Sequence, residues 1–188
     1  MRPQDVLLFA NATRLRLFPP LRAAWARVGE PAIVPATGRN DRWALFGALN
    51  VCTGHRIVVR QPRETGPGAR ALLTEIRRRY RRAPTIWVLL DQGSAHTAAP
   101  TRQLAADLRI ELVRLPKQWP ELNGMDQLWR ELKRLVAANR QANSVGELAQ
   151  QAEDWLRTLS PRETLRKAGI LSERFWLRHL LQKFWPDT

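Results

Sequence analysis

The sequence contains a single cysteine, Cys52, and no long uninterrupted apolar segment. One cysteine excludes an internal disulfide framework and is typical of a reducing compartment, and its apolar neighbours predict a buried thiol within a strand. No stretch approaches the roughly 20 apolar residues that cross a bilayer, and the amino terminus lacks a secretory signal pattern. Internal repeats and low-complexity tracts are also absent. These absences favour a cytoplasmic globular protein that has no membrane association.

Acidic residues are scarce relative to basic ones. The chain carries 31 Lys and Arg against 17 Asp and Glu, which gives a formal net charge of +14. Such a surface attracts polyanions, and the release of counterions from phosphates gives an affinity that depends strongly on salt and little on sequence. Nucleic acid is therefore the expected partner. The alternative is a basic protein with solvated arginines, and the densest run, Arg77 to Arg82, is most simply the solvated end of a helix.

An apolar run from Ile86 to Leu90 ends abruptly in Asp91. Five consecutive apolar residues predict a strand that is buried on both faces, so Asp91 would lie where this strand emerges. In open α/β sheets, ligands bind outside the carboxyl ends of the strands. A carboxylate at this position either opens a turn or holds a metal ion, and a turn is the commoner role.

A second acidic residue, Asp126, follows Asn123 by three positions, ahead of an apolar stripe at Leu128, Leu132 and Leu135. This pattern predicts a helix start with Asp126 in its first turn, facing the space beyond the strand ends. The helix dipole alone would favour an acidic group there, without any catalytic purpose. The pair of aspartates makes a shared site more plausible than either residue does alone.

The phrase LLDQGSAH, followed by LPKQWPELNGMDQLWRELK, resembles the catalytic core of bacterial insertion-sequence transposases of the mariner superfamily, which are DDE endonucleases. In that family the second acidic residue ends a strand in a phrase such as LDNAxxH, and the third lies in a phrase such as SPELNPIExxWxxLK. Asp91 and Asp126 match these two positions. The resemblance covers nearly the whole chain, including WALFGALNVCTG and the distinctive SPRETLRKAGILSERFW near the carboxyl terminus.

The resemblance implies an α/β fold of the ribonuclease-H-like type, in which a five-stranded mixed sheet is flanked by helices. The catalytic core would occupy residues 1–142, and a helical extension at residues 143–188 would pack on it. It also implies metal-dependent cleavage and transfer of DNA strands. Two Mg²⁺ or Mn²⁺ ions held by Asp91 and Asp126 would activate the attacking oxygen and stabilise the leaving oxygen.

Asn11 departs from the family pattern at the position of the first catalytic aspartate. An amide oxygen can touch a metal ion but brings no negative charge, so metal binding should be weaker and the chain severely impaired or inactive in strand cleavage. Asp5 cannot substitute, because a strand rises about 3.3 Å per residue and six residues separate the two positions. Either the natural chain lost this carboxylate by decay or domestication, or the aspartate was deliberately replaced.

The expected partners are transposon-end and target DNA, in a bacterial cytoplasm near the nucleoid, and a homodimer is allowed for. The helix-turn-helix region typical of the family would be separate or missing, because the first strand begins close to Met1. An inactive, transposase-derived DNA-binding or regulatory protein is the alternative, and a ribonuclease on this fold would need an acidic set that is not found. The predicted DNA contacts are Arg39, Arg42, His96, Lys117, Arg130, Lys133 and Arg134.

Hydrophobic periodicity and turn residues predict the order strand, strand, strand, helix, strand, helix, strand, helix. Ser94 and His96 are expected on a loop, with a structural or substrate-contacting role for His96, and Trp25 is expected to pack over the sheet. The amphipathic segment at residues 175–185 would contribute to the core or to an oligomer contact. The predicted strands are residues 6–13, 43–51, 56–61, 86–90 and 110–115, and the predicted helices are residues 69–82, 101–108 and 125–139, with two more that start at Ser144 and Ser160.

Overall fold

The computed structural model describes residues 4–31, 33–35 and 38–181. Its strands are β1 (Val6–Arg16), β2 (Arg42–Asn50), β3 (Arg56–Gln61), β4 (Ile86–Leu90) and β5 (Ile110–Arg114). Its helices are α1 (Gly66–Arg79), α2 (Ser94–Thr97), α3 (Ala99–Asp107), α4 (Gly124–Leu132), α5 (Val145–Thr158), α6 (Pro161–Lys167) and α7 (Arg178–Leu181). A 3₁₀ turn, η1 (Pro120–Leu122), precedes α4, and a π-helical turn, η2 (Lys133–Ala137), follows it.

The five strands form one mixed sheet in the order β3-β2-β1-β4-β5. β1 pairs antiparallel with β2, and β2 pairs antiparallel with β3, whereas β1, β4 and β5 run parallel. The parallel connections pass through helices, as a crossover between parallel strands requires. The predicted ribonuclease-H-like architecture is confirmed.

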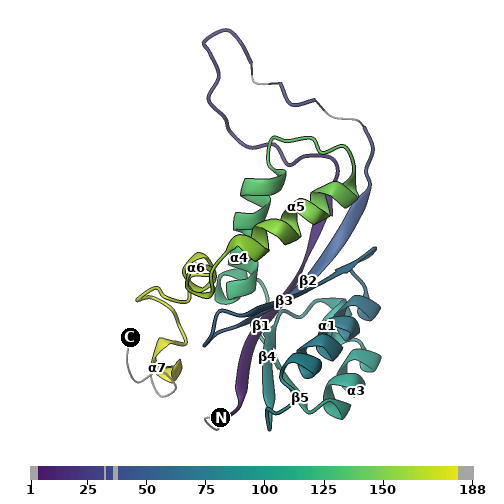
Figure 1. The fold of residues 1–188 in the computed structure, drawn as a ribbon, viewed down its shortest axis with the longest axis vertical. Coiled ribbons are helices and arrows are strands. Elements are labelled where there is room, and N and C mark those ends of the chain that lie inside the picture. Colours follow the sequence, from purple (N-terminus) through teal and green to yellow (C-terminus); the bar gives the residue numbers. More distant parts are fainter. Residues whose placement is uncertain (1–3, 32, 36–37, 182–188) are drawn as a thin grey trace.

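Alternation along β1 builds a core on each face of the sheet (Figure 1). Leu7 and Phe9 pack with α4, α5 and α6 on one face, while Leu8 and Ala10 pack with α1 and α3 on the other. Successive side chains of a strand point to opposite faces, so residue 11 continues the Phe9 face. The helix that carries Asp126 covers this same face.

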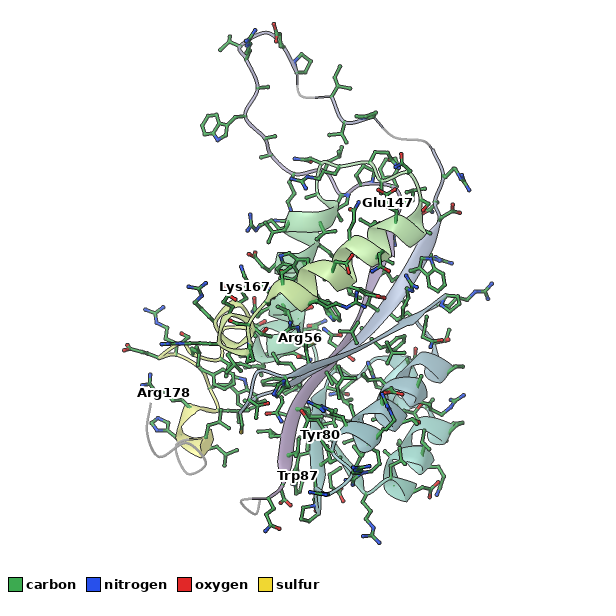
Figure 2. All side chains as sticks on the ribbon, viewed as in Figure 1. Arg56, Tyr80, Trp87, Glu147, Lys167 and Arg178 are labelled. Carbon is green, nitrogen blue, oxygen red and sulfur yellow. The ribbon has the colours of Figure 1, made fainter. Side chains whose placement is uncertain are left out.

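The segment from α5 to α7 shares the core of the α4 face rather than forming a separate one. Arg56 at the start of β3 fastens it, because its guanidinium donates hydrogen bonds to the carbonyls of Leu156 and Leu159 at the end of α5 (Figure 2). Helix ends leave carbonyls without intrahelical partners, and Arg56 satisfies two of them. Gly54 lies so close to the carbonyl of Pro161 that a side chain would displace it.

Both predicted helix starts in this segment are confirmed as N-caps. Ser160 and Glu163 form a complete capping box, with reciprocal bonds of 3.2 and 2.9 Å between side chain and backbone. At α5, Ser144 accepts from the backbone of Glu147, but the Glu147 carboxylate accepts from the backbone of Asn143 instead of closing the box. Residues 182–188 of the predicted extension lie outside the described residues.

Several local predictions are wrong. Trp25 is 103% exposed on the long connection between β1 and β2, which extends away from the sheet, so it does not pack on the sheet (Figure 1). Cys52 lies in the turn after β2 and is only half-buried, although burial still raises the pKa of its thiol. Ser94 and His96 belong to the short helix α2. The predicted helix at 69–82 begins at Gly66, because Pro67 fits a first helical turn.

Arg77 is likewise more than the solvated end of a helix. Its guanidinium donates to the carbonyls of Tyr80, Ala83 and Leu108, which ties the end of α1 to the segment before β5. The remaining arginines of the run are exposed. Among the residues that the structure describes, no helix has the length and apolar character that a membrane span needs.

Candidate active site

Asn11 and Asp91 lie side by side at the ends of two parallel strands. β1 and β4 are in register with Ala10 opposite Leu90, so residues 11 and 91 are the next pair along. Neighbouring strands are about 4.8 Å apart, and residue 11 continues the face that carries Phe9, whereas the Asp91 side chain, just past β4, contacts Gly93 and His96. The register thus places Asn11 and Asp91 at the same edge of the sheet, and α4 covers the face of Asn11.

Asn123 attaches α4 to the end of β1. It is 2% exposed, its Nδ2 donates to the carbonyl of Ala10 at 2.9 Å, and its Oδ1 accepts from the backbone of Met125 at 3.0 Å. The second bond makes Asn123 the N-cap of α4, as the sequence predicts. The start of α4 is therefore bonded to the residue that precedes Asn11 in β1. Asp126, in the first turn of α4, lies near the strand ends as a result.

Close packing between α4 and β2 holds this arrangement. A Cβ atom on Gly47, which pairs with Asn11 across the antiparallel ladder, would lie 2.6 Å from the ring of Trp129 and closer still to Met125. The indole of Trp129 donates to the carbonyl of Asn11 at 3.4 Å. The absence of a side chain at Gly47 lets the helix approach the strand that carries Asn11.

Asp126 makes two kinds of contact. Its Oδ1 accepts a hydrogen bond from the amide Nδ2 of Asn11 at 3.3 Å, and its Oδ2 accepts from Nε of Arg130 at 2.8 Å. The Oδ1 of Asn11 accepts from the backbone of Ala12 at 2.7 Å. The amide therefore presents its NH₂ group to the carboxylate, at the position where the family pattern has an anion.

Asp91 is held more loosely, with 54% of its side chain exposed. Its Oδ1 accepts from the backbone of Gly93 at 3.0 Å and lies 3.8 Å from Nε2 of His96. His96 is 6% exposed and its ring meets Phe46 edge to face. Burial lowers the pKa of His96, an effect that the charges of Asp91 and Glu64 partly oppose.

The donor set fits one divalent ion better than two. Magnesium takes oxygen ligands and is commonly held by one or two carboxylates together with waters and substrate phosphates. Asp91 and Asp126 can supply the two carboxylates. Within the described part of the chain, no three His, Cys, Asp or Glu side chains are grouped closely enough to hold a metal ion. Asp5, beside Trp87 at the opposite end of the strands, cannot complete the set (Figure 2).

The predicted DNA contacts have different surroundings. His96 is buried, so a direct DNA contact by its ring is not supported, and it supports Asp91 instead. Lys133 is half-buried, at the start of η2. Lys117 and Arg42 are exposed. Three others pair with acidic residues: Arg39 with Asp41 at 3.2 Å, Arg130 with Asp126 at 2.7 Å and Arg134 with Glu131 at 2.9 Å.

Sequence reasoning missed a cleft that adjoins Asp126. β1 continues past the end of β4, and its exposed Arg14 and Arg16 alternate with the buried Thr13 and Leu15. This alternation is the signal of a half-buried strand and could have shown that β1 extends beyond Thr13. The resulting cleft has a volume of about 820 Å³ and includes Glu64 and Lys133 in its lining.

Comparisons with known proteins match most of the chain. The model of the DDE superfamily endonucleases matches residues 6–149. An insertion element IS630 uncharacterized 39 kDa protein from Shigella sonnei is 26% identical over 156 residues, which are 82% of this chain and 46% of that protein. The chain therefore spans about half the length of this curated relative.

Solved structures of the Mos1 mariner transposase share the fold. The mariner Mos1 paired end complex with Mg superposes with a TM-score of 0.69 at 15% identity, covering 92% of this chain and 54% of that chain. The catalytic domain of Mos1 mariner transposase gives a TM-score of 0.63 at 14% identity, covering 90% of this chain and 78% of that one. At these identities the likeness concerns the fold alone.

Proposed function

Because this chain belongs to the DDE superfamily of endonucleases, we propose that it is the catalytic domain of an insertion-sequence transposase, impaired at its first acidic position. The observation that carries the proposal is the meeting of Asn11 with Asp126 at 3.3 Å, beside the parallel strand that ends in Asp91. The proposed substrate is DNA. Related Mos1 structures that include a transposon end, Mg or Mn support both the DNA and the metal.

Asp91 and Asp126 would hold the divalent ion, which when bound supplies Lewis-acid activation of the attacking and leaving oxygens. Asp126 is fixed through α4, whereas Asp91 follows the end of β4 in a turn held by Gly93. Arg130 balances the charge of Asp126 while the carboxylate has no other cation. The buried ring of His96 lies 3.8 Å from Asp91 and supports it.

Asn11 accounts for the proposed impairment. Its NH₂ group donates to Asp126 and so occupies a carboxylate oxygen that a metal ion would use. An aspartate of the same shape would place a second carboxylate about 3 Å from the first, which raises the pKa of the pair until a cation neutralises it. Compared with an aspartate, Asn11 thus lacks one negative charge. It also lacks the repulsion between two carboxylates that a bound cation would relieve.

The test is metal-dependent nicking of supercoiled plasmid by the parent chain and by its Asn11→Asp variant, in Mg²⁺ and in Mn²⁺. We expect the variant to nick at least about 100-fold faster, because loss even of outer-shell groups around a metal costs 10- to 100-fold. The double variants with Asp91→Asn or Asp126→Asn are the controls and should fall back to the parent rate. Equal nicking by parent and Asn11→Asp chains would refute the proposed impairment.

The second candidate is a DNA-binding or regulatory protein derived from a transposase. Asn11 favours it, because a site that satisfies its own carboxylate by hydrogen bonding needs no ion. Calorimetric titration with Mn²⁺ separates the two candidates: restored binding in the Asn11→Asp variant supports an impaired enzyme, whereas no binding by either chain supports the regulatory protein. The homodimer, the separate recognition region and the boundary at residue 142 stay predictions.

A further inference from the structure

The cleft beside Asp126 lies between the extension of β1 and the helical segment that follows α4. Asp126 belongs to its lining, so the cleft opens directly from the candidate active site. Its volume of about 820 Å³ lies within the range of pockets that bind a ligand of nucleotide size. The other residues of the lining are Ala12, Thr13, Arg14, Leu15, Arg16, Phe18, Pro19, Pro20, Leu21, Gly38, Asn40, Glu64, Lys133 and Ala137.

Cationic side chains reach this cleft from both walls. Arg14 and Arg16 are the exposed members of the alternating β1 extension. Lys133 follows Asp126 by seven residues, so it lies on the same helical face, about 10 Å further along the axis. Lys133 shares the lining of the cleft with Asp126 and Glu64, and their charges oppose the lowering of its pKa by burial. The cations therefore form a path that leads away from Asp126.

Glu64 forms an ion pair with one of these cations, Arg14. Its Oε2 lies 2.6 Å from Nε of Arg14, and both side chains remain partly exposed. Glu64 comes from the segment after β3, whereas Arg14 comes from β1, so this pair joins two separate segments that both line the cleft. A carboxylate on a guanidinium has the geometry with which a phosphate would bind it.

The far wall of the cleft is apolar and held in place. Phe18 is 51% exposed and is followed by Pro19 and Pro20, all within the lining. Asn139, just past η2, donates from its backbone to the carbonyl of Pro20 at 3.2 Å, and its side chain bonds both backbone polar groups of Arg22. An exposed aromatic ring beside a cationic path is the combination that binds single-stranded nucleic acid, because bases stack on the ring.

We propose that this cleft binds a single DNA strand as it leaves the active site, with Arg14, Arg16 and Lys133 on its phosphates, Phe18 under a base, and Glu64 covering Arg14 until a phosphate displaces it. The inference rests on the proposed function for its choice of DNA. It adds to that function a path for the strand and a carboxylate that competes with the substrate.

The test is equilibrium binding of a fluorescein-labelled single-stranded oligonucleotide to the parent chain, measured by anisotropy in EDTA so that no cleavage occurs. The key comparison is Glu64→Gln with Glu75→Gln. Each removes one negative charge, but Glu75 pairs with Arg78 on the exposed side of α1, away from the cleft. We expect Glu64→Gln to bind about threefold to tenfold tighter than Glu75→Gln, because Arg14 then meets the phosphate without a competitor.

The reverse comparison uses Arg14→Gln and Arg78→Gln, each of which removes one exposed cation. Arg14→Gln should bind threefold to tenfold more weakly than Arg78→Gln and should lower the slope of log K against log salt by about 0.7, the value for one phosphate contact on a single strand. Phe18→Leu should weaken binding of the single strand but not of a duplex of the same sequence. Thermal unfolding of each variant confirms that the fold is retained.

Two outcomes overturn the inference: equal affinities for the two glutamate variants, or a larger effect of Glu64→Gln on the duplex than on the single strand. Plasmid nicking by the Asn11→Asp variant tests the proposed function separately. If the Asn11→Asp variant nicks plasmid but Glu64→Gln and Glu75→Gln bind the oligonucleotide with equal affinity, only the inference about the cleft is refuted. A Glu64-specific gain without nicking would support the cleft as a single-strand site and refute the enzyme.

Discussion

The two acidic side chains of the site differ in how firmly the fold holds them. Asp126 is 25% exposed, lies in the first turn of a helix fixed to β1 by Asn123, and bonds to both Asn11 and Arg130. Asp91 is 54% exposed and depends on the backbone of Gly93 and the buried ring of His96. The charge of Asp126 is thus already compensated within the chain, whereas that of Asp91 remains available to an external cation.

The largest expected effect on stability comes from removing Asn123, which attaches the helix that carries Asp126 to β1. Asn123→Ala removes the N-cap of α4 and leaves the carbonyl of Ala10 without its partner, and we expect a loss of about 2 kcal/mol or more in the free energy of unfolding. Ser144→Ala, which removes one exposed cap bond from α5, should cost about 1 kcal/mol. Urea denaturation measures both, and equal costs would contradict the anchoring role of Asn123.

A smaller effect is expected from removing the ion pair between Asp126 and Arg130, which leaves the carboxylate of Asp126 more available to a metal ion. In the Asn11→Asp background, Arg130→Gln should tighten Mn²⁺ binding about twofold to fivefold, since an exposed ion pair is worth at most about 1 kcal/mol. Arg134→Gln is the matched control, because Arg134 pairs with Glu131 instead. Calorimetric titration without DNA gives both affinities. No difference between the two variants would mean that Arg130 does not compete with the ion.

The Asp91 side should respond to pH through its buried support. Burial lowers the pKa of His96 below its ordinary value of 6.5, so the unfolded chain binds a proton that the folded chain resists. The contribution of His96 is therefore most favourable above pH 6.5, and the free energy of unfolding falls as the pH drops below that value. His96→Gln should flatten this acid-side decline in urea titrations from pH 7 to 5, and an unchanged decline would contradict this role of His96.

The smallest effect concerns the far end of the helix that carries Asp126. Hydrogen bonds from Arg134 and Lys167 lower the pKa of Glu131 to about 2, and Lys167 links this helix to α6 (Figure 2). The folded pKa lies below the ordinary value of 4.5, so the stabilisation is present above pH 4.5 and is lost as the pH falls towards 2. Glu131→Gln should cost under about 1 kcal/mol at pH 7, and less at pH 3.

Much of this arrangement follows from local sequence signals. The apolar run before Asp91 and the cap signal at Asn123 each predict where an element begins or ends, and parallel pairing of β1 with β4 brings the two ends together. The contact between Asn11 and Asp126 needs in addition the close approach at Gly47, which depends on a residue of another strand. No local pattern indicates that approach.

The sequence reasoning failed where tertiary partners override local composition. The predicted strand at residues 6–13 ends too early, because the alternation of Arg14 and Arg16 with Leu15 was overlooked, and pairing with β2 keeps β1 extended to Arg16. Trp25 is expected to pack over the sheet, yet its connection extends away from the sheet and leaves it exposed. The bond between Glu64 and Arg14 joins residues fifty positions apart and has no signature in either segment.

The unequal lengths of β1 and β4 have a consequence for how this fold can vary. Beyond Ala10, β1 pairs only with β2, and this two-stranded ribbon separates residues 23–31 from the acidic edge, whereas Phe18 to Leu21 line the cleft. Closing a longer loop costs little, about 0.6 kcal/mol for each doubling of its length. Insertions or deletions there would be absorbed by the ribbon before they reached Asn11. The connection can therefore diversify between lineages while the geometry of the chemistry stays fixed.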